Sequence, residues 1–130
     1  MTHPLNTTAR LLLHRHFIGR RMTGRVSLMQ IERWNSDVGG PLTEKALRRR
    51  LEQQGYLVSR YVYPPGTRFP DHSHSIDKVD AVLSGRFRLI LEGEEVILQA
   101  GDSVAVPRGA VHSAEVVGEE PVVSLDACMP

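Results

Sequence analysis

The fold is decided by two stretches of this sequence, GTRFPDHSHSIDKVDAVLSG at residues 66–85 and GDSVAVPRGAVH at residues 101–112. In both, short runs of apolar and polar residues end at glycine or proline, which is typical of strands joined by tight turns. His72 and His74 are two residues apart, so an extended backbone sends both side chains to the same face. His112 begins a further predicted strand behind a Pro-Arg-Gly turn. A curled sheet would bring it opposite the first pair, where three imidazoles could meet one cation.

Strands are predicted on both sides of these stretches as well. Short apolar runs are separated by turn residues at the spacing that is typical of an antiparallel sandwich or barrel. The predicted strands cover residues 26–34, 56–63, 79–83, 87–91, 95–98, 103–106, 111–117 and 122–125. No repeat of fixed period is visible, so propellers and solenoids are excluded.

One helix is predicted ahead of the barrel strands, over residues 42–54. A Gly-Gly-Pro break at residues 39–41 precedes it. Thr43 can cap its first turn, and Gly55 supplies a left-handed stop. The three arginines at 48–50 lie toward the negative end of the helix dipole. They favour a solvated helix surface over a phosphate-binding face.

Length and composition indicate one globular domain without a strongly charged surface. The chain has 130 residues, 41% apolar and 24% charged, with a net charge of +1. Such a balance does not predict binding to nucleic acid or to a membrane. No apolar run approaches the roughly 18 residues of a membrane helix, and one predicted helix cannot form a helix-turn-helix. Cys128 is the one cysteine, which favours a reducing compartment, and we expect a cytoplasmic protein.

The N-terminal segment differs from the rest in composition. Residues 1–31 contain five arginines and no acid before Glu32. This is the composition of an organellar transit peptide, or of an upstream extension of a protein that begins at Met22 or Met29. We favour a basic, poorly ordered tail over residues 1–25, because no apolar periodicity persists through it.

The two decisive stretches resemble both defining motifs of the cupin superfamily. The first motif is Gly-x5-His-x-His-x3,4-Glu-x6-Gly, and the second is Gly-x5-Pro-x-Gly-x2-His-x3-Asn. The matching positions are Gly66, His72, His74 and Gly85 for the first motif and Gly101, Pro107, Gly109 and His112 for the second. Lys78 stands in place of the Glu, and Val116 in place of the Asn. The resemblance covers residues 56–127 of a barrel domain that we place at 26–130.

The resemblance implies an all-β fold, a jelly-roll barrel (double-stranded β-helix), here with one short N-terminal helix. It also implies a divalent cation in the barrel mouth, commonly Fe, Mn, Ni, Zn or Cu. His72, His74 and His112 would each give one neutral ring nitrogen to the metal and leave positions open for water or substrate. Gly85 and Gly101 would permit turn conformations that a Cβ would penalise.

Lys78 leaves three alternatives open for this site. An ammonium cannot ligate a metal, so the centre could use three histidines, with Lys78 turned away or neutral. Lys78 could instead displace the metal and bind a small anion together with the histidines. In the third alternative Asp80, or Asp77 across a bulge, becomes the ligand; Asp80 could equally pair with Lys78. We favour the first alternative.

Two functions from different classes are compatible with these residues. The first is a mononuclear metal oxygenase, isomerase or lyase acting on a small organic acid or diketone. In it Lys78, with a pKa lowered beside a cation, and Asp80 are candidate catalytic residues. The second is a non-catalytic, metal-free cupin that binds a small anionic ligand. In either case the partner is a small molecule, and a homodimer could form by strand addition through residues 26–34.

Overall fold

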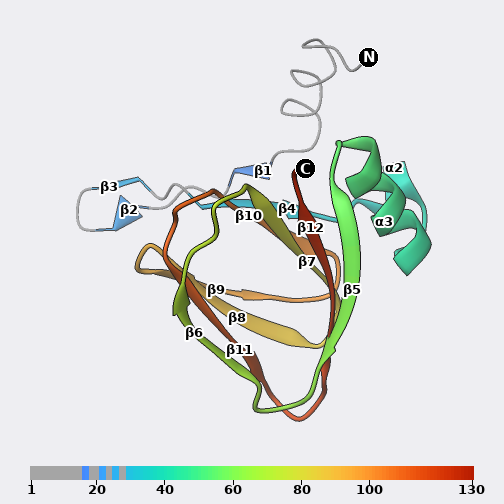
Figure 1. Cartoon of the computed structure of the whole chain (residues 1–130). Helices are drawn as coiled ribbons and strands as arrows, with labels where there is room; N and C mark the ends of the chain where they lie inside the picture. The colour runs from blue at the N-terminus through green and yellow to red at the C-terminus, as the bar shows by residue number, and fades with distance from the viewer. Residues whose placement is uncertain (1–15, 18–20, 23–24, 27–28) are drawn as a thin grey trace.

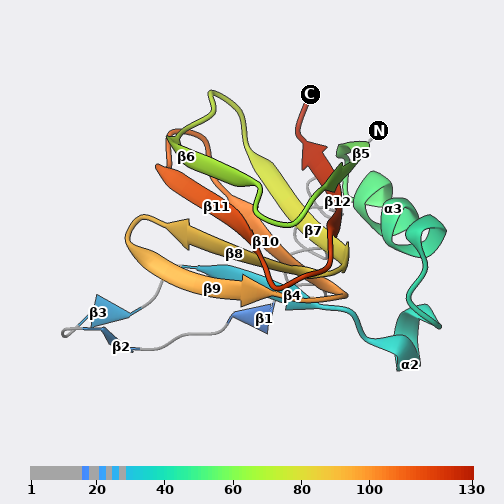
Figure 2. The ribbon, with the colours of Figure 1, turned by 90° about the horizontal axis from the view of Figure 1, so that it is seen from below.

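The computed structural model describes the backbone of residues 16–17, 21–22 and 25–26 and the whole of residues 29–130. Two antiparallel sheets face each other (Figures 1 and 2), with a cluster of buried apolar side chains between them. This arrangement confirms the predicted all-β jelly roll, which is a double-stranded β-helix. The predicted tail over residues 1–25 lies mostly outside the described residues.

The larger sheet has six strands in the order β1-β4-β10-β7-β12-β5. Their bounds are β1 (His16–Phe17), β4 (Gln30–Arg33), β10 (Asp102–Val106), β7 (Lys78–Ser84), β12 (Val122–Cys128) and β5 (Leu57–Tyr63). The smaller sheet has the order β6-β11-β8-β9. Its strands are β6 (Arg68–His72), β11 (His112–Val117), β8 (Arg86–Leu91) and β9 (Glu94–Leu98). A separate pair consists of β2 (Arg21–Met22) and β3 (Arg25–Val26).

Side-chain alternation divides the large sheet into an inner and an outer face. The inner face joins the barrel core, whose buried members are Met29, Ile31, Val82, Phe87, Leu89, Leu91, Leu98, Val104, Val106, Val116 and Val122. Val79 and Ala81 belong instead to a second cluster on the outer face, together with helix residues Leu47 and Leu51. Because Val82 faces inward, Lys78 and Asp80 on the same strand do so too. The sequence alone did not show which of the two alternating sets of side chains on this strand faces the interior.

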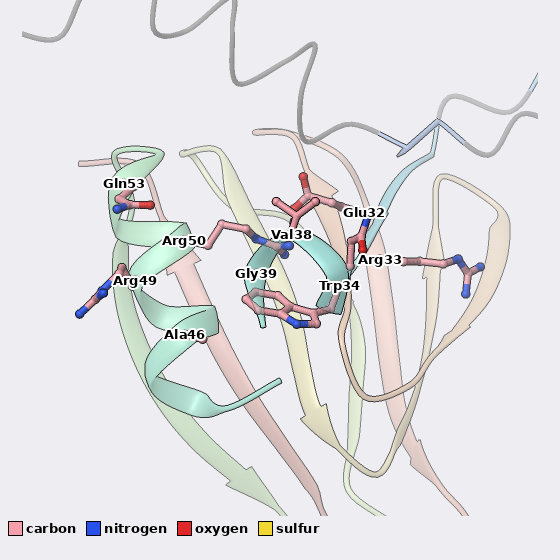
Figure 3. Close-up of a pocket in the computed structure, with 10 residues that line it drawn as sticks. Glu32, Arg33, Trp34, Val38, Gly39, Ala46, Arg49, Arg50 and Gln53 are labelled. Atoms are coloured by element: carbon pink, nitrogen blue, oxygen red, sulfur yellow. Dashed lines mark ion pairs between the residues drawn. The ribbon is translucent and has the colours of Figure 1, made fainter. Parts of the chain in front are cut away.

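The helix α3 (Glu44–Gln53) covers the outer face beside β5 and β12 (Figure 1). It lies within the predicted range, and Thr43 Oγ1 accepts the Ala46 N–H at 3.1 Å, as expected of a cap. Arg50 connects the helix to β4 and to the residue that follows it. Its guanidinium lies 2.9 Å from a carboxylate oxygen of Glu32 and 4.9 Å from the centre of the Trp34 ring (Figure 3). These contacts border an outer cavity of about 490 Å³.

Two details of the N-terminal region differ from the sequence-based expectation. Residues 36–39 form a short helix, α2 (Ser36–Gly39), which was not among the predicted elements. The Asn35 side chain accepts the Asp37 N–H at 2.9 Å, which caps this single turn. The strand expected over residues 26–34 is the shorter β4, and both of its edges are paired within the chain, to β1 and to β10. Dimerisation through β4 would therefore require strand exchange.

No helix among the described residues is both long enough and apolar enough to cross a membrane.

Gly85 and Gly101 occupy backbone conformations that other residues rarely adopt. Their φ angles are +84° and +92°. A Cβ on Gly85 would overlap the carbonyl oxygen of Pro121, and one on Gly101 would lie 3.0 Å from Trp34 Cβ. The motif glycines are therefore needed both for the turn and for the close approach of a second segment.

We expect Gly85→Ala to destabilise the protein more than Gly93→Ala. Both glycines have a φ of +84°, but a Cβ on Gly93 would meet nothing within 4 Å. The left-handed strain of about 1–2 kcal/mol is common to both variants, whereas the overlap at Gly85 adds about 1–3 kcal/mol. Urea unfolding of the two variants and the wild type measures the difference. Equal losses of unfolding free energy in the two variants would show that the close approach of Pro121 to Gly85 does not matter for stability.

Candidate metal centre

Two strand ends and two loops bring the three histidines together at one end of the barrel. His72 ends β6 and His112 begins β11, and their Cα atoms are direct partners in the β6–β11 ladder. His74 lies in the loop after β6, and its carbonyl oxygen accepts the Gly109 N–H at 2.8 Å. This bond joins the β6–β7 loop to the turn that precedes His112. The predicted convergence of the three residues is therefore present.

The imidazole rings are close enough to share one small ligand. Ring centres lie 4.2 Å apart for His72 and His112, 4.9 Å for His72 and His74, and 5.0 Å for His74 and His112. One ligand atom from each residue lies within 4.8 Å of the other two. Among the described residues, this group is the one cluster of three or more potential metal ligands, and it contains no carboxylate.

Two of the rings are held by backbone carbonyls in a way that leaves Nε2 available. The Nδ1 atom of His72 is 2.7 Å from Pro70 O, and that of His112 is 3.0 Å from Ala110 O. A carbonyl oxygen can only accept, so Nδ1 carries the proton in both rings and donates it. The Nε2 lone pair of the neutral ring then remains free for a metal, an arrangement that is common in metal-binding histidines.

Burial keeps the more enclosed histidines neutral. His112 is only 4% exposed, and its burial lowers its pKa, an effect that outweighs the opposing bond to Ala110. The pKa of His74 is also lowered, first by burial and then by the positive charge of Lys78. The neutral imidazole is the form that binds metal. The electrostatics therefore favour a ligand-competent state at neutral pH.

Lys78 does not occupy the centre as a free cation. Its ammonium donates a hydrogen bond to Asp126 Oδ2 at 2.9 Å, and both side chains are largely buried, with 17% and 20% exposed. Burial would lower the pKa of Lys78, but the hydrogen bond to Asp126 and the charges of Asp126 and Asp80 outweigh it and raise the pKa above the usual value. The pKa of Lys78 in the metal-free chain is therefore raised, whereas we expected a lowered pKa for Lys78 beside a metal cation.

Neither acid that the sequence offered as a replacement ligand joins the histidines. Asp77 Oδ1 accepts the Arg108 N–H at 2.9 Å and so holds the loop that leads to His112. Asp80 faces the barrel interior as the ladder partner of Asp126. Asp126 was not among the predicted site residues, because the predicted strand stopped at residue 125. Extending the alternation of Val122 and Ser124 by one step would have placed Asp126 on the same face.

An aromatic cluster lies in the interior beyond this polar layer. Tyr63, at the end of β5, packs edge-on against Phe69 with ring centres 4.9 Å apart and stacks on Phe87 at 5.6 Å. Lys78, at the start of β7, is level with the histidine loops, whereas Tyr63 pairs with Val122 toward the opposite end. The histidines therefore stand at the mouth of a barrel whose far interior is apolar.

Comparison with known families identifies the fold as one already described. Residues 59–128 match the Cupin domain family, which is more than half of the chain. The protein belongs to the cupin family. No curated protein sequence matches this cupin.

Several solved structures are similar to this cupin. The protein TT1209 from Thermus thermophilus is 29% identical, with a TM-score of 0.53 over 58% of this chain and 72% of that chain. An uncharacterized conserved protein with a double-stranded β-helix domain from Klebsiella pneumoniae is 27% identical, with a TM-score of 0.52 over 58% and 68%. The DMSP lyase DddQ from Ruegeria pomeroyi is 26% identical, with a TM-score of 0.50 over 56% of this chain but only 38% of that chain.

We expect Lys78→Met to destabilise the protein by about 3 kcal/mol, because it leaves Asp126 and Asp80 without their cation. Lys45→Met is the matched control, since Lys45 is the other lysine of the chain and is exposed on α3. The loss should be larger at pH 8 than at pH 5, because Asp80, with a pKa of about 7, is ionised only at the higher pH. Urea unfolding at both pH values measures this. An equal loss at the two values would contradict the described cluster.

Proposed function

We propose that this cupin binds one divalent cation through His72, His74 and His112 and uses it to act on a small molecule at the barrel mouth. The observation that carries the proposal is the convergence of three imidazole nitrogens within 4.8 Å. Imidazole ligands suit Fe, Ni, Zn and Cu, and the resemblance to cupins adds Mn to the candidates. Three protein ligands leave coordination positions for water or substrate.

The surroundings of the histidines support a cation at this position. Two rings have Nδ1 bonded to a carbonyl, so each keeps Nε2 free. The ammonium of Lys78, which would repel a metal, is neutralised by Asp126 at 2.9 Å. This pairing also removes the main support for the alternative, a metal-free barrel that binds an anion through Lys78, because the lysine already has its counter-ion.

The chemistry that we propose is a metal-assisted reaction of a small organic acid or diketone, by an oxygenase, an isomerase or a lyase. A bound cation would supply Lewis acidity toward a substrate oxygen. The chain itself would hold the cation through the histidines, orient the rings through Pro70 O and Ala110 O, and keep water from the aromatic interior. The similarity to a DMSP lyase supports including the lyases among these classes.

The biological context of this function remains a prediction. We propose a cytoplasmic protein whose partner is a small-molecule ligand or substrate and which forms a homodimer. Because β4 is paired on both edges, the dimer would form by exchange of a strand or through an outer strand of a sheet.

We expect the purified protein to bind about one divalent metal ion per chain, and His72→Ala to weaken this binding. The expected loss exceeds the 10–100-fold that removal of an outer hydrogen-bonding partner costs, since a direct ligand is removed. Ser73→Ala is the matched control, because it changes the residue between the two histidines. Equilibrium dialysis with elemental analysis measures stoichiometry and affinity.

A second control concerns the N-terminal histidines, since His14 and His16 are also two residues apart. The dialysis is therefore repeated on a chain in which both are replaced by alanine. If this chain binds much less than one metal ion and added metal does not restore it, the proposed function is wrong.

A further inference from the structure

Two carboxyl groups face each other inside the barrel, one on each of two neighbouring strands. Asp80 on β7 and Asp126 on β12 are direct Cα partners in the ladder. Both lie one inward-facing position deeper than the pair Lys78 and Cys128, which are also ladder partners. Ionised carboxylates directly opposite each other repel, so this pairing needs a compensating interaction.

One oxygen of Asp126 lacks a hydrogen-bond donor. Its Oδ2 accepts from Lys78 at 2.9 Å, but its Oδ1 is buried and no donor among the described residues reaches it. A buried acceptor without a donor is costly, on the order of 1–3 kcal/mol. The facing group is the Asp80 carboxyl, which lies within hydrogen-bonding reach of Asp126. A carboxyl group can donate only when it is protonated.

The charges around Asp80 and Asp126 also favour one bound proton on this pair. From β12 the facing groups are Asp126 and Cys128, and from β5 they include Tyr63, whose pKa burial raises to about 12. The neighbouring strand β10 contributes only the apolar Val104 and Val106 at the positions opposite Asp80 and Lys78. Lys78 is thus the one nearby cation among the described residues whose charge acts on Asp80.

The histidines flank the same cluster along the chain. Lys78 begins β7 four residues after His74, and its partner Val106 ends β10, directly before the turn that leads to His112. For Asp80, burial first, and then the charge of Asp126 and the hydrogen bond with it, raise the pKa to about 7, against the lowering effect of Lys78. One ammonium, two carboxyl groups and one proton make the cluster neutral.

We propose that Asp80 and Asp126 share one proton at neutral pH, carried by Asp80 and bonded to Asp126 Oδ1, and that this pair is the proton store of the histidine centre. The sharing of the proton depends only on the cluster, whereas its use by the centre rests on the proposed function. When the pair gives its proton to a bound molecule, two carboxylates remain beside Lys78, and water returns the proton. Such a store favours isomerisation, in which a substrate gains one proton and gives up another.

The direct test is a carbon NMR titration of protein labelled at the aspartate carboxyl carbons. The chain has six aspartates, and this label excludes Glu32, whose pKa burial also raises to about 7. We expect one aspartate carbon to titrate with a midpoint near pH 7 and to disappear in Asp80→Asn. In Asp37→Asn, a change of an exposed aspartate on α2, it should persist. A spectrum in which every aspartate titrates near pH 4 would overturn the proposal.

Stability against pH gives a second, independent readout. Because the pKa of Asp80 is raised, the folded state holds more protons than the unfolded state between about pH 4 and pH 7. Stability should therefore fall as pH rises through that window and level off above it. Asp80→Asn, which keeps a donor for Asp126 Oδ1, should fold and lose this part of the fall, while Asp126→Asn should be destabilised at pH 7. If Asp80→Asn were the less stable variant at pH 7 and Asp126→Asn the more stable one, the assignment of the proton to Asp80 would be contradicted.

Zinc addition separates the two proposals. If Zn²⁺ binds beside the cluster, the midpoint of the high-pH aspartate should move to lower pH in the wild type, because a cation favours the carboxylate. It should not move in His112→Ala. A high midpoint with no zinc binding would refute the metal function and keep the shared proton. Zinc binding that leaves the midpoint unchanged would refute the role as proton store.

Discussion

The pairing of His112 with His72 across the β6–β11 ladder is the constraint on which the site depends. It places two imidazoles next to each other on one sheet, with ring centres 4.2 Å apart and ring planes tilted by 53°. The third ring is brought in by one backbone hydrogen bond, from Gly109 to the His74 carbonyl. Loop residues alone would hold three side chains poorly, whereas strand ends and a bonded turn lower the entropic cost of ordering them.

The barrel accommodates charged groups because they are arranged in layers. Lys78 stands level with the histidine loops, Asp80 and Asp126 lie one step deeper, and the aromatic cluster around Tyr63 follows. A buried carboxylate is tolerated only when paired and hydrogen-bonded. The lysine in the place of the family's glutamate is thus the counter-ion of a buried acid pair, and it leaves the proposed metal site to the three histidines.

Much of this arrangement was predictable from the sequence because it depends on local patterns. The short predicted strands indicated an antiparallel sandwich or barrel, and the two-residue spacing of His72 and His74 put both on one face. The resemblance to the cupin motifs then implied the jelly roll and the convergence with His112. The partner of Lys78 was not predictable, because Asp126 lies 48 residues away and pairs with it only through strand order. Alternation also could not decide which face of β7 is the inner one. That choice is made by α3, which packs Leu47 and Leu51 against Val79 and Ala81.

X-ray absorption spectroscopy of the metal-loaded protein reports which atoms surround the cation, so it can show whether all three histidines bind it. The sample is the zinc-loaded chain in which His14 and His16 are replaced by alanine, so that the metal reports on the barrel. We expect three imidazole nitrogens at about 2.0–2.1 Å, with oxygen ligands in the remaining positions. A spectrum with fewer than three imidazoles in the first shell would contradict this expectation.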